Sequence, residues 1–186
     1  MNNTIIFLRH AETQKDKDTP VSKWHLTNDG KERAESLSKT GIFNDVDIII
    51  SSSEKKAYDT ALPFAKQLGK EIIQIAELGE IDRDKGTLLT QEEYDTMKVR
   101  IFEDLDYTAY GWETARHALE RFKSAVEKID KEYEGKKILI VSHGTVMALY
   151  RAYLEKRLND IFSVWKSLGF CDWYVVMDDK IKNAIH

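Results

Sequence analysis

Apolar residues occur along this chain in short continuous runs that alternate with longer stretches of helical periodicity. The continuous runs favour buried strands because both faces of such a strand are covered. The strand candidates are Thr4–Leu8, Asp47–Ser51, Glu71–Ile75, Lys137–Val141 and Trp173–Met177. The first, second and fourth of them are continuous apolar runs of this kind. A sixth, Lys180–Ile185, follows the turn signal Asp178-Asp179 and is predicted to form an edge hairpin.

The stretches between these runs have apolar residues at helical spacing. They predict helices over residues 27–39, 57–68, 90–101, 115–129 and 146–154. Strands that alternate with helices predict an α/β fold, a three-layer α/β/α sandwich with a largely parallel central sheet. No Pro- or Gly-rich linker divides the chain, so we expect a single domain over residues 1–186. The irregular stretch around 77–111 is predicted to be an insertion that covers the site.

Composition narrows the function classes. The net charge is −4 over 186 residues, which argues against nucleic-acid binding, since that needs a net basic face. A single cysteine, Cys171, cannot form an internal disulfide. No apolar run approaches the roughly 20 residues of a membrane span, and the N-terminus lacks the pattern of a signal peptide. We therefore expect a cytoplasmic protein with neither membrane nor nucleic-acid partners.

Two of the predicted strands end on a histidine. Arg9-His10 follows the first strand, and Ser142-His143-Gly144 follows the fourth. Open α/β sheets bind ligands at the carboxyl ends of their strands. Two imidazoles and a guanidinium at this edge suit an anionic, phosphate-like group.

Five sequence blocks, in order along the chain, resemble the histidine phosphatase superfamily, which includes the phosphoglycerate mutases. The blocks are Arg9-His10-Ala11-Glu12-Thr13, Leu26–Gly30, Ser51–Ala61, Gly111–Thr114 and Val141–Gly144. The resemblance implies the α/β/α fold of that family and a phosphatase that hydrolyses phosphate monoesters through a phosphohistidine.

The resemblance also implies roles for individual residues. It makes His10 the nucleophile, which requires one unprotonated ring nitrogen, while the other should donate to a backbone carbonyl. Arg9 and His143 would stabilise the charge that develops on the phosphoryl oxygens. The N–H of Gly144, at a helix start, is a further candidate donor. Thr13 is a candidate substrate contact.

Glu113 is a second candidate substrate contact, since its counterpart in the family faces the pocket. The simpler interpretation is that Glu113-Thr114 opens and caps the helix that follows.

A leaving alkoxide needs a proton, so we expect a carboxylic acid that stays protonated near neutral pH. The family takes this acid from a Leu-x-Glu pattern after the third strand, and Leu78-Gly79-Glu80 matches it. The residues that usually follow in the family are absent here. Glu77 and Asp82 therefore remain alternatives to Glu80.

Lys56 stands where the family has arginine. Lysine is a mobile point charge, whereas arginine presents a planar fork to two phosphate oxygens. Lys56 is predicted to bind phosphate still, although less specifically. In the alternatives, Arg83 or another basic residue replaces it, the site is a weakened one, or Lys55 and Lys56 are only solvated charges at a helix end.

The sequence thus predicts a phosphatase acting on a small phosphorylated substrate, with no metal and no nucleotide cofactor. No His, Cys, Asp or Glu cluster has metal-ligand spacing, and phosphate-binding glycine loops are missing. A phosphohistidine-protein phosphatase, a phosphoglycerate mutase and a non-catalytic phospho-ligand binding protein remain alternatives. The oligomeric state is not indicated.

Overall fold

A six-stranded sheet forms the centre of the protein. The computed structural model describes residues 2–84 and 89–185. Residues 85–88, part of the predicted insertion, lie outside this range. The sheet order is β3-β2-β4-β1-β5-β6, in which β1 to β4 are parallel and β5 and β6 are antiparallel to their neighbours. The strands are β1 (Thr4–Arg9), β2 (Ile48–Ser51), β3 (Ile72–Gln74), β4 (Lys137–Ser142), β5 (Trp173–Met177) and β6 (Lys180–Ile185).

Six α-helices follow the predicted pattern with one addition. They are α1 (Asn28–Lys39), α2 (Lys55–Leu68), α3 (Gln91–Glu103), α4 (Ala115–Glu132), α5 (Gly144–Leu154) and α6 (Ile161–Lys166). The Thr27 side chain caps α1, and Thr90 with Glu93 forms the predicted capping box of α3. Helix α6 and the two 3-10 turns, Val21–Lys23 and Ala76–Leu78, are too short for periodicity to reveal.

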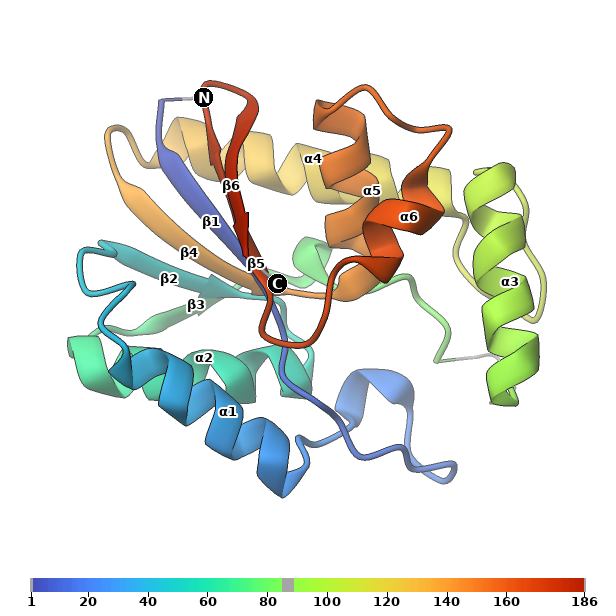
Figure 1. Ribbon diagram of the computed structural model, residues 1–186, viewed down its shortest axis with the longest axis horizontal. Coiled ribbons are helices and arrows are strands. Elements are labelled where there is room, and N and C mark those ends of the chain that lie inside the picture. Colours follow the sequence, from blue (N-terminus) through green and yellow to red (C-terminus); the bar gives the residue numbers. More distant parts are fainter. Residues whose placement is uncertain (1, 85–88, 186) are drawn as a thin grey trace.

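The alternating side chains of β1 show how the sheet is covered on both faces. Ile5 and Phe7 pack on the face covered by α4 and α5, whereas Ile6 and Leu8 pack on the face covered by α2. Figure 1 shows these layers, with α1 and α2 on one side of the sheet and α4 and α5 on the other. The predicted three-layer α/β/α fold is confirmed.

The carboxyl ends of three parallel strands meet at one edge of the sheet. Arg9 of β1 pairs with Ser142 of β4, and Ser51 of β2 pairs with Val141 of β4. The residues that follow, His10, Ser52 and His143, therefore leave the sheet side by side. This register brings the two predicted histidines together.

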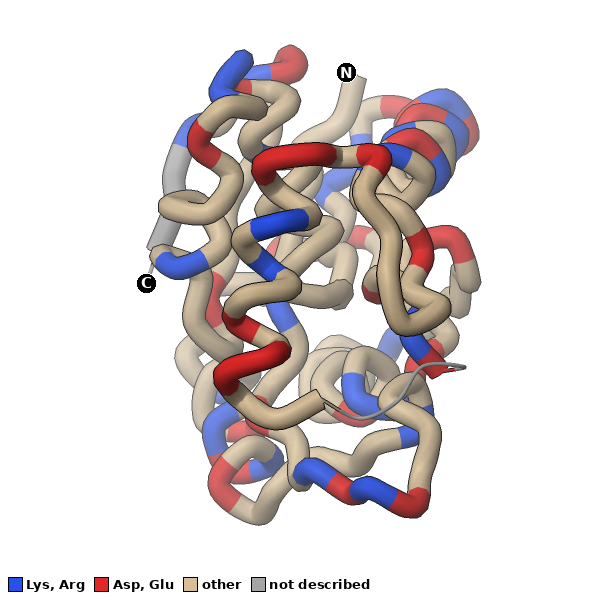
Figure 2. The backbone as a smooth tube through the Cα atoms, turned by 90° about the vertical axis from the view of Figure 1, so that its right-hand side faces the viewer, with Lys and Arg blue, Asp and Glu red and all other residues tan. Residues whose placement is uncertain are grey.

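Charged residues of both signs are spread along the outer helices (Figure 2). Over residues 2–84 and 89–185, no helix combines the length and apolar character needed to cross a membrane.

Candidate active site

His10 lies immediately after β1 with only 6% of its surface exposed. Its Nδ1 is 2.7 Å from the carbonyl oxygen of Ala11. A carbonyl can only accept, so Nδ1 carries the hydrogen and Nε2 has a free lone pair. Burial, assisted by the charges of Lys56 and Arg9, holds the pKa of His10 well below its ordinary value. The expected backbone-fixed tautomer is therefore present, and the ring is neutral at pH 7.

His143 faces His10 from the end of β4. The two ring centroids are 5.1 Å apart. The Nε2 of His143 is 2.6 Å from the Oγ of Ser52, which follows β2. Burial lowers the pKa of His143 well below its ordinary value. The pair is thus made of two neutral imidazoles with fixed positions.

The guanidinium of Arg9 lies across the start of α5. It lies over the ring of Phe170, with 4.3 Å from Cζ to the ring centroid, and it donates to the carbonyl of Leu168. A Cβ on Gly144 would approach Cζ and Nε of Arg9 to 3.0 Å. Glycine at this position therefore lets the guanidinium lie close to the backbone at the start of α5.

The carboxylate of Glu80 caps the N-terminus of α5. Its Oε2 accepts from the N–H of Thr145 at 3.0 Å, and its Oε1 accepts from the N–H groups of Ile81 and Val146. Burial on its own raises the pKa of Glu80, but Lys98, then His143 and the N–H groups of Thr145 and Ile81, lower it by more. The pKa of Glu80 consequently lies well below its ordinary value. The expectation of an acid that is protonated near neutral pH is therefore wrong for the substrate-free protein.

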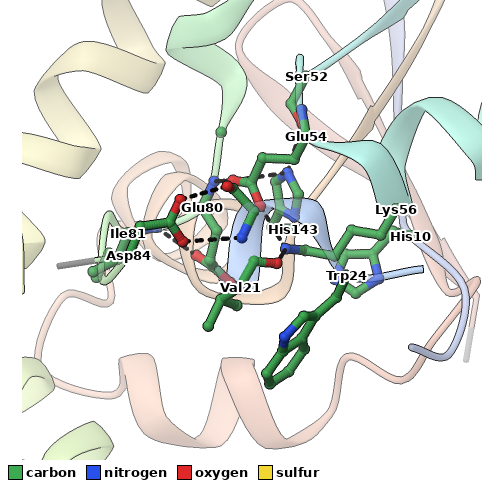
Figure 3. Close-up of polar contacts among 12 residues, drawn as sticks. His10, Val21, Trp24, Ser52, Glu54, Lys56, Glu80, Ile81, Asp84 and His143 are labelled. Carbon is green, nitrogen blue, oxygen red and sulfur yellow. Dashed lines mark hydrogen bonds and ion pairs between the residues drawn. The ribbon is translucent and has the colours of Figure 1, made fainter. Parts of the chain in front are cut away.

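Lys56, in the first turn of α2, is 3% exposed. Its Nζ donates to Glu54 Oε2 at 2.5 Å and to the carbonyl of Val21 at 2.8 Å (Figure 3). The interpretation of Lys56 as a solvated helix-end charge is thus wrong. Its charge is nevertheless shared with Glu54, so a phosphate would compete with that carboxylate.

A cavity of about 460 Å³ opens over these groups. Of the predicted site residues, it is lined by Arg9, His10, Thr13, Lys56 and Glu80. Its outer wall comes from the N-terminal loop, the segment between Leu78 and α3, α3 itself, α6 and the loop after α6. The residues are Lys15, Trp24, Arg83, Tyr94, Trp165 and Phe170. The predicted insertion therefore supplies part of the wall.

Arg83, the alternative to Lys56, lines the same cavity. Its guanidinium lies over the rings of Tyr94, Trp112 and Trp24, at 5.0, 5.4 and 5.9 Å from the ring centroids. Within the part of the chain that the structure describes, it forms no ion pair with a carboxylate. Arg83 thus presents a cation to the outer part of the cavity.

Glu113 does not line this cavity, and its contacts favour the simpler interpretation of a structural role. Its carboxylate pairs with Arg121 at 2.7 Å and contacts His117, while Thr114 caps α4. Arg121 also donates to the carbonyls of Glu77, Gly79 and Glu80. The Glu113–Arg121 pair therefore positions the segment that carries Glu80. Neither Glu77 nor Asp82, the rivals of Glu80, lines the cavity.

Sequence reasoning missed four residues around the site: Ser52, Glu54, Lys98 and Arg121. Lys98 of α3 did have a signal, because it falls on the same helical face as Tyr94 and Phe102. A lysine within an apolar stripe is unusual, and it is 1% exposed here. Among the described residues, no cluster of His, Cys, Asp or Glu could hold a metal ion.

An α/β sandwich with two neutral histidines and two cations at one sheet edge defines a phosphate-handling class of protein. The model of the histidine phosphatase superfamily (branch 1) matches residues 5–176. The chain belongs to this superfamily, and the phosphatase activity predicted from the sequence is confirmed at that level.

Relatives and solved structures agree with this assignment. Phosphoserine phosphatase 1 of Hydrogenobacter thermophilus is 29% identical over 171 residues, covering 86% of this chain and 80% of its own. A phosphoserine phosphatase from Entamoeba histolytica in complex with phosphoserine has a TM-score of 0.77 at 21% identity, with 98% and 96% coverage. YhfR of Bacillus stearothermophilus has a TM-score of 0.77 at 22% identity, with 97% and 94% coverage.

Proposed function

We propose that this phosphatase hydrolyses small phosphate monoesters in two steps through a phosphohistidine on Nε2 of His10. The observation that carries this proposal is the hydrogen bond from Nδ1 of His10 to Ala11, which leaves Nε2 unprotonated inside the cavity. A neutral imidazole attacks phosphorus and splits one difficult hydrolysis into two easier steps.

Cationic groups around His10 support the charge that develops on the phosphoryl oxygens. Arg9 and Lys56 line the same cavity as His10, whereas His143 is fully buried behind it with its ring centroid 5.1 Å from that of His10. Fixed charges aimed at a transition state usually contribute the largest share of catalysis. Thr13 remains a proposed substrate contact at the cavity wall.

Glu80 is the group proposed to protonate the leaving oxygen and then to accept a proton from the attacking water. It is the one of the three candidate carboxylates that lines the cavity. The ionised carboxylate can accept a proton from the water that hydrolyses the phosphohistidine. Protonation of the leaving oxygen in the first step requires that Glu80 first gain a proton.

For the substrate, we propose a phosphate monoester whose leaving group carries a second anionic group. Arg83 supports this, because its guanidinium faces the outer cavity without a carboxylate partner among the described residues. A cavity of about 460 Å³ leaves room beyond a phosphate. The Entamoeba histolytica relative binds phosphoserine, whose carboxylate is such a group.

The test is turnover of 4-nitrophenyl phosphate by the purified protein, followed by a panel of phosphoserine, 3-phosphoglycerate and glycerol phosphate. We expect hydrolysis, with Arg83→Met raising KM for the two carboxylate-bearing esters and leaving that for glycerol phosphate nearly unchanged. Binding of phosphate without turnover would instead support the non-catalytic alternative. A cytoplasmic location and a single domain stay predictions of the sequence.

A further inference from the structure

Lys98 is a buried lysine that the proposed reaction does not use. Its side chain projects from α3 into a cage of aromatic rings, and its Nζ lies 5.1–5.9 Å from the ring centroids of Tyr94, Phe102, Trp112 and Trp165. Its hydrogen-bond partner is the Oγ1 of Thr145 at 2.5 Å. Burying an ammonium costs several kcal/mol in general, which aromatic faces offset only in part. A burial of this kind calls for a nearby negative charge.

Thr145 connects this ammonium to Glu80. The hydroxyl of Thr145 accepts from Lys98, and the backbone N–H of the same residue donates to Glu80 Oε2 at 3.0 Å. Thr145 itself is fully buried. In such a setting the attraction between the ammonium and the carboxylate is poorly screened.

Other charged groups also surround Glu80, one from each neighbouring element. Arg121 of α4 is paired with Glu113, and Glu54, beside α2, is paired with Lys56. His143 is neutral, as described above.

Two further cations near Glu80 are Arg9 and Lys98, of which Lys98 is ion-paired with no carboxylate among the described residues. Arg9 lines the cavity, so a bound phosphate engages its charge. Lys98 lies behind the cavity wall, out of reach of a bound phosphate, so its positive charge continues to favour the ionised form of Glu80.

We propose that Lys98 is a positioning residue that, through Thr145, holds Glu80 as a carboxylate until the substrate delivers a proton. This rests on the proposed phosphatase mechanism. The enzyme then takes the monoanion of the ester, RO–PO₃H⁻, and the phosphate proton passes to a Glu80 oxygen. As the Nε2–P bond forms and the P–O bond to the leaving group breaks, Glu80 gives this proton to the leaving oxygen. Glu80 is again a carboxylate, able to take a proton from the water that attacks the phosphohistidine.

The first test follows the protonation of Glu80 without using activity. The ¹³C signal of its side-chain carboxyl, assigned by comparison with Glu80→Gln, is titrated in the wild type and in Lys98→Met. We expect the wild-type carboxyl to stay ionised between pH 5 and 8. In Lys98→Met its midpoint should rise by several pH units, into this range, as when a buried carboxylate loses an opposite charge. Identical titrations in the two proteins would overturn the proposal.

The second test uses the pH dependence of kcat/KM for glycerol phosphate. In the wild type it should fall above about pH 6, where phosphate monoesters lose their second proton. In Lys98→Met the fall should move to higher pH, because Glu80 can then hold its own proton. A merely structural role for Lys98 predicts lower activity with an unmoved profile, which would also overturn the proposal.

Matched variants separate charge from packing. Lys98→Arg keeps the charge and should retain the wild-type profile. Lys123→Met removes a lysine that lies over Tyr153 on the surface and should change neither readout. Thr145→Val removes the bridging hydroxyl but keeps the N–H to Glu80, and it should shift both midpoints in the same direction as Lys98→Met. It also provides the test should Lys98→Met not fold. If the wild type forms no phosphoenzyme, the proposed function is refuted. The carboxyl titration would still test whether Lys98 sets the ionisation of Glu80.

Discussion

The Nδ1 of His10 donates a hydrogen bond of 2.7 Å to the carbonyl oxygen of Ala11, the next residue along the chain. This contact needs no partner from elsewhere in the fold, so the tautomer is set as soon as the chain turns at the end of β1. A nucleophilic Nε2 therefore follows from local geometry.

His10→Ala should abolish turnover and leave the fold intact. Rapid quenching with labelled substrate should trap an acid-labile, base-stable phosphoenzyme in the wild type and none in the variant. The matched control is His25→Ala, since His25 is an exposed histidine outside the cavity. Normal turnover by pure His10→Ala protein would contradict the assignment.

Glu80→Gln should slow esters with poor leaving groups by about 10²–10⁴-fold, the usual contribution of general acid–base catalysis. 4-Nitrophenyl phosphate should lose much less in the first step, because its leaving group needs little protonation. Steady-state rates on both substrates measure the difference. Glu77→Gln and Asp82→Asn are the controls, as both carboxylates lie outside the cavity. An equal loss on both substrates would move the acid role to another residue.

The strands and the histidine pair could be predicted because they depend on local signals. Continuous apolar runs marked β1, β2 and β4, and parallel pairing alone brings His10 and His143 to one edge. The capping residues Thr27 and Thr90 could also be predicted from the sequence, because a cap is a contact between residues three positions apart.

The ionisation of Glu80 could not be predicted, because it depends on contacts across the fold. Lys98 and Thr145 are 47 residues apart and meet only when α3 packs against the start of α5. The same holds for Glu113, whose partner Arg121 turns it away from the cavity. Sequence blocks indicate which residue types are present, whereas the partner that a charge finds is a tertiary property.

Glu54→Gln should strengthen inhibition by vanadate or phosphate. The carboxylate of Glu54 holds Lys56 and would compete with a bound oxyanion.

Lys56→Ala should weaken inhibition by vanadate or phosphate by about 1.5–3 kcal/mol, the scale of a charge-assisted hydrogen bond. Lys56→Arg should hold or improve affinity. Inhibition constants that are unchanged in all three variants would remove Lys56 from the phosphate site.

Stability should fall as the pH drops below about 6.5, the ordinary histidine value. The pKa of His10 and that of His143 are both lowered in the folded state, so below pH 6.5 the unfolded chain binds more protons than the folded one. Their contribution is complete above pH 6.5 and is lost towards the lower folded values, by at most about 1.4 kcal/mol per pH unit for each ring. The free energy of unfolding, measured with urea at pH 5, 6 and 7, should fall less steeply with decreasing pH in His10→Gln than in the wild type. His25→Gln should follow the wild type, and parallel slopes for all three proteins would contradict this account.

Arg121 connects α4 to the segment that carries Glu80, and its removal should affect catalysis more than phosphate binding. Its guanidinium holds the carbonyls of Glu77, Gly79 and Glu80 while it pairs with Glu113, whose side chain is 9% exposed. Arg121→Met should lower the free energy of unfolding by about 1–3 kcal/mol, because the Glu113 carboxylate then keeps only His117 and the N–H of Asp82 as partners. Adding Glu113→Gln should restore part of this loss, and the double-mutant cycle measures the coupling.

In both variants kcat for glycerol phosphate should drop while phosphate inhibition stays close to the wild type, since Arg9 and Lys56 are untouched. A parallel loss of phosphate affinity would mean that Arg121 supports the whole cavity rather than the position of Glu80.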